Sequence, residues 1–234
     1  MTSTVIGRDR YQRNASQSAR REYNVAHPIL ENQMNNPNDL EAPTEQLEVT
    51  EEMRRVLRGA RVTDEEAFRT GQQQVEAMIA SKAPLADILD SLVHMIEAQS
   101  PGMLCSVLLL SDDGDHIRHG AAPSLPPDYV KAIDGEPIGP KNGSCGTAMY
   151  RGEPVVVSDI LMSPLWEDYR QVAQGSGLRA CWSTPIMSRR GKVLGSFAMY
   201  YRQPKRPTGE EARLTQVATQ LAAKAIESRN EAKR

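Results

Sequence analysis

The stretch KNGSCGTAMYRGEPVVVSDI, residues 141–160, places Cys145 between Gly143 and Gly146 and just before an apolar run. The glycines and the TAMYR that follows them are typical of a tight turn that opens a short helix, and GEPVVVSD predicts a strand. The positive end of a helix lowers the pKa of a thiol and makes the thiol more reactive. The motif therefore raises the question whether Cys145 is a nucleophile, a cofactor anchor or only a small residue that fits.

The composition of the whole chain excludes several classes of protein. Of its 234 residues 39% are hydrophobic and only 5% aromatic, so we expect one domain with a core of aliphatic residues and methionine. A formal net charge of −2 gives no general attraction to nucleic acid or anionic lipid. The chain also lacks the apolar run of about 20 residues that a membrane helix needs, and its polar start is unlike a signal peptide. We therefore expect a cytoplasmic protein that binds neither nucleic acid nor membrane.

The cysteines and histidines give little sign of a metal site or of thiol catalysis. Cys105, Cys145 and Cys181 are widely spaced, odd in number and without a CxxC pair, so we expect reduced thiols, no disulfide framework and no metal. None of the four histidines is placed by spacing to act as a base for Cys145. The surrounding motifs of tetrapyrrole-binding cysteines and an axial ligand for haem are not evident either, and the sequence identifies no cofactor.

Three regions can be distinguished along the chain. Residues 1–48 are polar, with arginines early and acidic residues later, and predict a mobile arm that can dock on a partner. Residues 49–83 predict a helical lead-in of two helices, 51–60 and 64–80, separated at Gly59 and capped by Thr63. Residues 84–230 carry the main domain.

The main domain alternates between helical and strand periodicity. The segments 84–99 and 210–229 have apolar residues at i, i+3, i+4 and i+7, which predicts long helices with one buried stripe. Further helices are expected at 125–133, at the glycine motif and at 164–177. Strands are expected at 103–111, 116–123, 152–159, 179–188 and 194–202, the first two and the last two as hairpins.

These segments resemble a GAF domain from about Pro84 to Ile226. The matching motifs are GSCGTAMYRGEPVVVSDI, PLW, GLRACWSTPI and GKVLGSFAMYY, in order and at suitable spacing. GAF domains are the small-molecule sensing modules of phosphodiesterases, phytochromes and bacterial sensor kinases, and the resemblance is closest to those beside bacterial kinases and cyclases. It implies an α+β fold with a central antiparallel sheet, helices on one face that often dimerise, and a ligand pocket on the other. No NKFDE-type signature of the cyclic-nucleotide-binding subclass is present.

The motifs suggest which side chains line such a pocket. The N–H groups of the helix that begins at the glycine motif suit a small anion. Trp166 and Tyr169 are three residues apart, hence on one helical face, and can close the pocket as an aromatic lid. In the strand RACWSTPI, Cys181 and Ser183 share one face and Trp182 the other, and the period cannot say which face meets ligand. The candidate residues are Ser144, Cys145, Gly146, Thr147, Trp166, Tyr169, Cys181, Trp182 and Ser183.

We therefore expect a homodimeric sensor that binds a small molecule or small anion. Only ESRNEAKR follows Ile226, so we expect no catalytic output domain and a signal that leaves through a partner protein. One alternative is a ligand-free interaction scaffold. Another is an enzyme like the GAF-fold reductase of free methionine sulfoxide, using Cys145. That family carries a second cysteine after the aspartate of the following strand. Here the segment LMSPLWEDYRQVAQGSG after Asp159 holds no cysteine and Cys181 lies on the next strand, so we expect Cys145 to be a small buried residue that can touch ligand.

Overall fold

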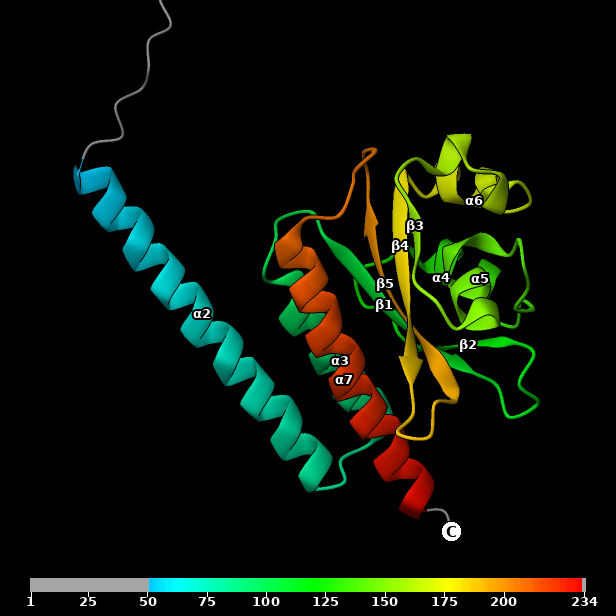
Figure 1. Ribbon diagram of the computed structural model, residues 1–234, viewed down its shortest axis with the longest axis horizontal. Coiled ribbons are helices and arrows are strands. Elements are labelled where there is room, and N and C mark those ends of the chain that lie inside the picture. Colours follow the sequence, from blue (N-terminus) through cyan, green and yellow to red (C-terminus); the bar gives the residue numbers. More distant parts are fainter. Residues whose placement is uncertain (1–50, 233–234) are drawn as a thin grey trace, which may run out of the picture. The chain divides into compact units, whose positions relative to one another are not determined.

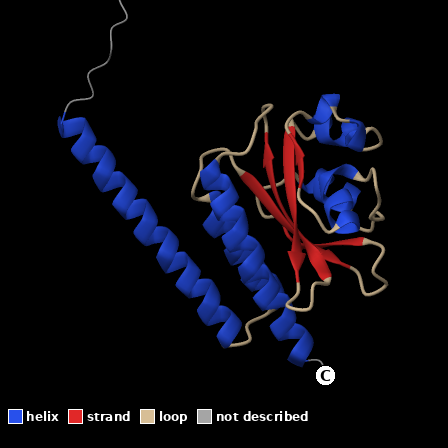
Figure 2. Ribbon diagram, viewed as in Figure 1, coloured by secondary structure: helices blue, strands red, loops and turns tan. Residues whose placement is uncertain are grey.

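The computed structural model describes residues 51–232, with side chains described over 65–230. Within this part the chain forms one five-stranded antiparallel sheet in the order β2-β1-β5-β4-β3, with helices against it (Figures 1 and 2). The strands are β1 (Leu104–Leu110), β2 (Ile117–Ala121), β3 (Val155–Val157), β4 (Ala180–Met187) and β5 (Val193–Tyr201). The expected α+β class with a central antiparallel sheet is confirmed. The predicted arm, 1–48, lies outside the described residues.

One face of the sheet packs against two long helices, α3 (Leu85–Glu97) and α7 (Gly209–Ala232), as Figure 1 shows. The apolar stripe predicted for α3 is buried, and Leu89, Leu92 and Ile96 are completely inaccessible. These side chains meet Phe197 of β5 and the leucines and alanines of α7 in one apolar cluster. We call this face of the sheet the helix face.

The lead-in is a single helix, α2 (Glu51–Ala80), where two helices were expected. A lone glycine in a helix costs only about 1 kcal/mol relative to alanine, so Gly59 does not end it. Thr63 accordingly lies within the helix and does not begin one. Farther along, Phe68 and Val75 are buried in the helix-face cluster, which places this part of α2 against the main domain.

Short helices cover the opposite face, which we call the pocket face. They are α4 (Pro127–Ile133), α5 (Gly143–Arg151) and α6 (Arg170–Gly175), with two 3-10 turns, η1 (Ile160–Met162) and η2 (Pro164–Trp166). The helix expected over 164–177 is therefore wrong in its first half. The side chains of Asp159 and Ser163 accept hydrogen bonds from the backbone two residues on, and these local turns replace the first turns of a regular helix.

The structure also bears on the membrane question. In residues 51–232, no helix combines the length and the apolar character needed to cross a bilayer.

Candidate functional site

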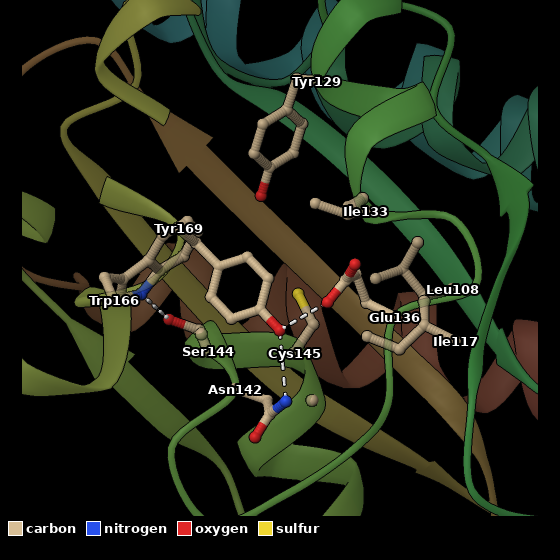
Figure 3. Close-up of a pocket in the computed structure, with 12 residues that line it drawn as sticks. Leu108, Ile117, Tyr129, Ile133, Glu136, Asn142, Ser144, Cys145, Trp166 and Tyr169 are labelled. Carbon is tan, nitrogen blue, oxygen red and sulfur yellow. Dashed lines mark hydrogen bonds between the residues drawn. The ribbon is translucent and has the colours of Figure 1, made fainter. Parts of the chain in front are cut away.

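The pocket face contains a small, partly open cavity lined by residues of α4 and α5 (Figure 3). Its volume of about 20 Å³ is close to that of one water molecule. Leu108 of β1, Ile117 of β2, and Tyr129 and Ile133 of α4 form an apolar wall. The remaining lining residues are polar, aromatic or glycine and come from the loop before α5, from α5 and from the segment around η2: Glu136, Asn142, Gly143, Ser144, Cys145, Gly146, Trp166 and Tyr169.

The glycine motif is required by close packing at the start of α5. Gly143 has a φ of 59°, a left-handed conformation that favours glycine, and a Cβ there would lie 3.8 Å from the Trp166 ring. A Cβ at Gly146 would come within 2.8 Å of the Asn142 Cβ. The Thr147 hydroxyl accepts a hydrogen bond from the Asn142 backbone N–H at 3.1 Å. The expected helix is confirmed, and its glycines and Thr147 serve to hold its first turn against the neighbouring loop.

Ser144 ties this helix to two other elements. Its hydroxyl donates to the carbonyl oxygen of Cys181 in β4 at 3.0 Å. It also accepts from Nε1 of Trp166 at 3.0 Å (Figure 3). Trp166 is only 2% exposed, so it is a wall of the pocket. The expectation that Trp166 and Tyr169 share a helical face is wrong, because Trp166 ends η2 while Tyr169 directly precedes α6. Both nevertheless line the same cavity.

Tyr169 is a half-buried residue of the cavity lining. Its hydroxyl donates to Oε2 of Glu136 at 2.9 Å and accepts from Nδ2 of Asn142 at 3.2 Å (Figure 3). Burial and the neighbouring Glu136 carboxylate raise the pKa of Tyr169 to about 12, so the phenol stays protonated and remains a donor. Two side chains from the loop before α5, Glu136 and Asn142, thus hold a half-buried aromatic ring at the cavity.

Hydroxyls and thiols gather on the sheet below Cys145. Its Sγ lies 3.4 Å from the hydroxyl of Tyr200, which also contacts the Ser106 hydroxyl at 3.2 Å. Hydrogen bonding by the Cys181 thiol, and then by Tyr200, Ser183 and Ser196, outweighs burial and lowers the pKa of Cys145. Burial raises the pKa of Cys181. This group of residues can therefore stabilise a thiolate at Cys145.

The predicted site residues fall into three groups: residues that line the cavity, buried residues that do not line it, and Trp182 on the helix face. Ser144, Cys145, Gly146, Trp166 and Tyr169 line the cavity. Cys181, Ser183 and Thr147 are buried behind the lining residues.

Trp182 does not belong to the pocket. Successive strand residues point to opposite faces, and Trp182 lies on the helix face, where its ring is 4.9 Å from that of Tyr201. Its Nε1 donates to the backbone oxygen of Lys205 at 3.2 Å. The pocket candidate Trp182 is therefore corrected to a packing residue.

The sequence reasoning missed Glu136, Asn142 and the apolar wall. Glu136 follows Gly135, which has a φ of 87°, and Asn142 directly precedes the glycine motif. A carboxylate and an amide that flank the turn-forming segment before a glycine motif are a weak signal that could have marked them. Strand alternation could have placed Tyr200 on the same face as Cys181, its cross-strand partner.

Comparisons with known proteins agree with this architecture. A family model described as "GAF domain" matches residues 82–227. A methyl sulfide methyltransferase-associated sensor from Methanosarcina acetivorans is 41% identical over 156 residues, or 67% of this chain. The chain spans only 16% of the length of that sensor.

Two solved structures are similar in fold. The GAF domain of a phosphoenolpyruvate-protein phosphotransferase from Coxiella burnetii has a TM-score of 0.57 at 18% identity, covering 72% of this chain and 98% of that one. A free methionine-R-sulfoxide reductase from Neisseria meningitidis, in complex with its substrate, has a TM-score of 0.54 at 18% identity, covering 70% and 91%. At such identities the likeness concerns the fold alone.

Proposed function

Because the chain belongs to the GAF domain family, we propose that it is a sensing module whose pocket binds a small neutral or cationic molecule. The family and the sensor relative support a role in sensing and signalling. Ligand binding, a signalling partner protein, a homodimer formed through the long helices and a cytoplasmic location are parts of the proposal. The cavity and its charge support the first of these.

The charge of the lining residues supports a neutral or cationic ligand. Among the described residues that line the cavity, Glu136 is the one carboxylate and none is a lysine or an arginine. A carboxylate at the entrance repels an anion and attracts a cation. The first turn of α5 still offers N–H groups, but the Asn142 N–H before it is already bonded to Thr147. We therefore favour a neutral or cationic ligand over the small anion that the glycine motif suggested.

The observation that carries the proposal is the Tyr169 lid. A cavity of about 20 Å³ has no room for a metabolite, so a ligand must displace the ring. Displacement breaks the bonds to Glu136 and Asn142, leaving a carboxylate and an amide that a ligand can engage in place of the phenol. A ligand shifts a conformational equilibrium only by its differential affinity for the two states, and these freed groups provide that difference.

Thermal melting of the purified chain tests the proposal. The probes are small amines, neutral heterocycles and, for comparison, small carboxylates of similar size. A ligand at 100 times its Kd adds about 2.7 kcal/mol, which raises the Tm of a domain of this size by about 5 to 10 °C. We expect a rise with an amine or a heterocycle, and an amine effect that disappears in Glu136→Gln.

Two tyrosine variants show whether the lid controls binding. Tyr169→Phe lacks the hydroxyl that holds the lid closed, so it should bind the same probe more tightly. Tyr150→Phe is the matched control, because Tyr150 is 58% exposed, away from the cavity. Stabilisation by carboxylates alone, or equal effects of the two tyrosine variants, would contradict the proposed site.

The small cavity also favours a second candidate, the ligand-free scaffold. A pocket filled by its own side chains is what an interaction module predicts. If no probe raised the Tm of wild type or of Tyr169→Phe, the ligand-free scaffold would replace the sensor as the proposed function.

A further inference from the structure

We propose that Cys145 and Cys181 are a redox-active thiol pair, which a hydroperoxide that enters the pocket oxidises to an intramolecular disulfide. This modification site goes beyond ligand binding and does not depend on it. It would give the same domain a second input, the level of peroxide.

Two contacts bring the cysteines together from different elements. Cys145 is in the first turn of α5, and the neighbouring Ser144 hydroxyl is bonded to the Cys181 backbone oxygen at 3.0 Å. Tyr200 is the cross-strand partner of Cys181 on β5, and its hydroxyl lies 3.4 Å from the Cys145 sulfur. Both cysteines belong to the same buried cluster on the pocket face. The first turn of α5 is thus fixed above the strand residue that carries the second thiol.

The surroundings of Cys145 suit a nucleophile. A thiolate needs hydrogen-bond donors where water is excluded, and the Tyr200 hydroxyl, 3.4 Å from the Cys145 sulfur, can supply one. The hydroxyls of Ser183 and Ser196 are buried on the same face and have no hydrogen-bond partner among the described residues, so they are free to turn toward a thiolate. The lowered pKa of Cys145 agrees with this arrangement, since the thiolate is the reactive form.

Access distinguishes the two thiols. Cys145 lines the cavity, which a small peroxide can enter when the Tyr169 ring is displaced. Cys181 is completely inaccessible and does not line it. The pocket therefore exposes one thiol to an oxidant and keeps the other behind it, which assigns the attacking role to Cys145 and the resolving role to Cys181.

The reaction has two steps. The Cys145 thiolate attacks one peroxide oxygen: an S–O bond forms, the O–O bond breaks, and the released alkoxide takes up a proton to leave as an alcohol, or as water from hydrogen peroxide. The Cys181 thiol then loses its proton and attacks the Cys145 sulfur. The S–S bond forms, the S–O bond breaks, and the hydroxide leaves with that proton as water. Two thiols lose two electrons in total, and one peroxide is reduced.

The third cysteine provides an internal control. Cys105 lies on the helix face, is completely inaccessible and does not line the cavity. Burial, followed by the nearby Glu97 carboxylate, raises the pKa of Cys105 well above its usual value. It should stay reduced under conditions that oxidise the other two.

The test is to treat the purified full chain with hydrogen peroxide and to map its thiols by mass spectrometry without reducing agent. Wild type and Cys105→Ser should each lose two free thiols and yield a 145–181 cross-linked peptide. Cys145→Ser should lose the reaction. Cys181→Ser should stop at a sulfenic acid on Cys145, which a 1,3-dicarbonyl reagent traps. The circular dichroism and melting of each variant show whether it is folded.

The wild-type map alone can overturn the proposal, whatever the folding of the variants. Three reduced thiols after treatment, or a Cys105 that oxidises as readily as Cys145, would do so. A parallel sample receives free methionine sulfoxide in place of peroxide. Oxidation by methionine sulfoxide with release of methionine, and none by peroxide, would replace this proposal by the reductase alternative. If no probe raised the Tm but peroxide still formed the 145–181 disulfide, the proposed ligand binding would be contradicted and the redox-active thiol pair would be supported.

Discussion

The two faces of the sheet are built from the same strands but have different chemistry. The helix face buries aliphatic side chains of α3 and α7 against Phe197 and Met199. The pocket face buries Tyr129, Tyr200, several serine hydroxyls and two thiols around a small cavity. Burial raises the pKa of Cys105 on the first face, whereas hydrogen bonding lowers that of Cys145 on the second. The difference indicates that one face provides stability, whereas the other buries the polar groups on which the proposed binding and oxidation depend.

The largest expected effect comes from removing a buried side chain on the helix face. Leu92→Ala deletes a completely inaccessible side chain of α3 and should lower the free energy of unfolding by about 3 kcal/mol. At 2 to 4 °C per kcal/mol this is a Tm loss of roughly 6 to 12 °C, measured by calorimetry. The folded protein should still form the 145–181 disulfide. Met162→Ala is the control, because Met162 is 79% exposed and should melt like wild type.

Two outcomes would contradict the division of roles between the two faces: a Leu92→Ala variant that melts like wild type, or one that is folded but no longer forms the 145–181 disulfide with peroxide.

A smaller effect is expected from the one buried carboxylate on the helix face. Glu211 bonds to Lys205 at 2.6 Å and to the hydroxyl and N–H of Thr208 at 2.8 Å, and Tyr201 donates to it as well. Burial raises the pKa of Glu211, but these bonds together outweigh burial and lower it to about 2. Because the folded pKa lies below the unfolded one, the carboxylate stabilises the protein above about pH 4.5 and ceases to do so as the pH falls toward 2.

At neutral pH the free energy of unfolding of Glu211→Gln should therefore be roughly 2 to 3 kcal/mol lower than that of wild type. Between pH 4.5 and 2 it should fall less than that of wild type, because the variant has no carboxylate at this position to protonate. Urea unfolding across that range measures both quantities. Glu210→Gln is the control, since the side chain of Glu210 is 63% exposed and its pair with Arg213 lies at the surface. If the free energy of unfolding changed with pH in the same way in wild type and Glu211→Gln, the stabilising role given to the Glu211 carboxylate would be contradicted.

The sequence predicts the helix face better than the pocket face, for a physical reason. The stripe of α3 and the alternation of Cys181, Trp182 and Ser183 are local patterns with fixed periods, and the structure confirms both. The lid depends on Glu136, Asn142 and Tyr169, which meet from separate loops over 33 residues of sequence. The sequence periodicity of helices and strands does not relate positions that lie in separate loops. Which side of the strand faces the cavity is likewise decided by α5 and not by the strand.

The smallest effect sharpens the comparison on the pocket face itself. Ser106 and Ser196 are both completely inaccessible, but Ser106 contacts the Tyr200 hydroxyl, whereas the Ser196 hydroxyl has no hydrogen-bond partner among the described residues. Removing a buried hydroxyl that lacks a strong partner is close to neutral, whereas removing a bonded one costs about 1 kcal/mol. Ser196→Ala should thus leave the Tm within a few degrees of wild type, and Ser106→Ala should lower it.

The same serine pair separates stability from reactivity. If the Ser196 hydroxyl stabilises the Cys145 thiolate, Ser196→Ala should raise the pKa of Cys145 above its wild-type value of about 7. The rate of Cys145 alkylation by iodoacetamide, followed against pH, reports that pKa because only the thiolate reacts. A midpoint that moves upward at unchanged Tm would show that this buried hydroxyl serves the thiol. A lowered Tm at an unchanged midpoint would instead make Ser196 a packing residue and bring the pocket face closer to the helix face.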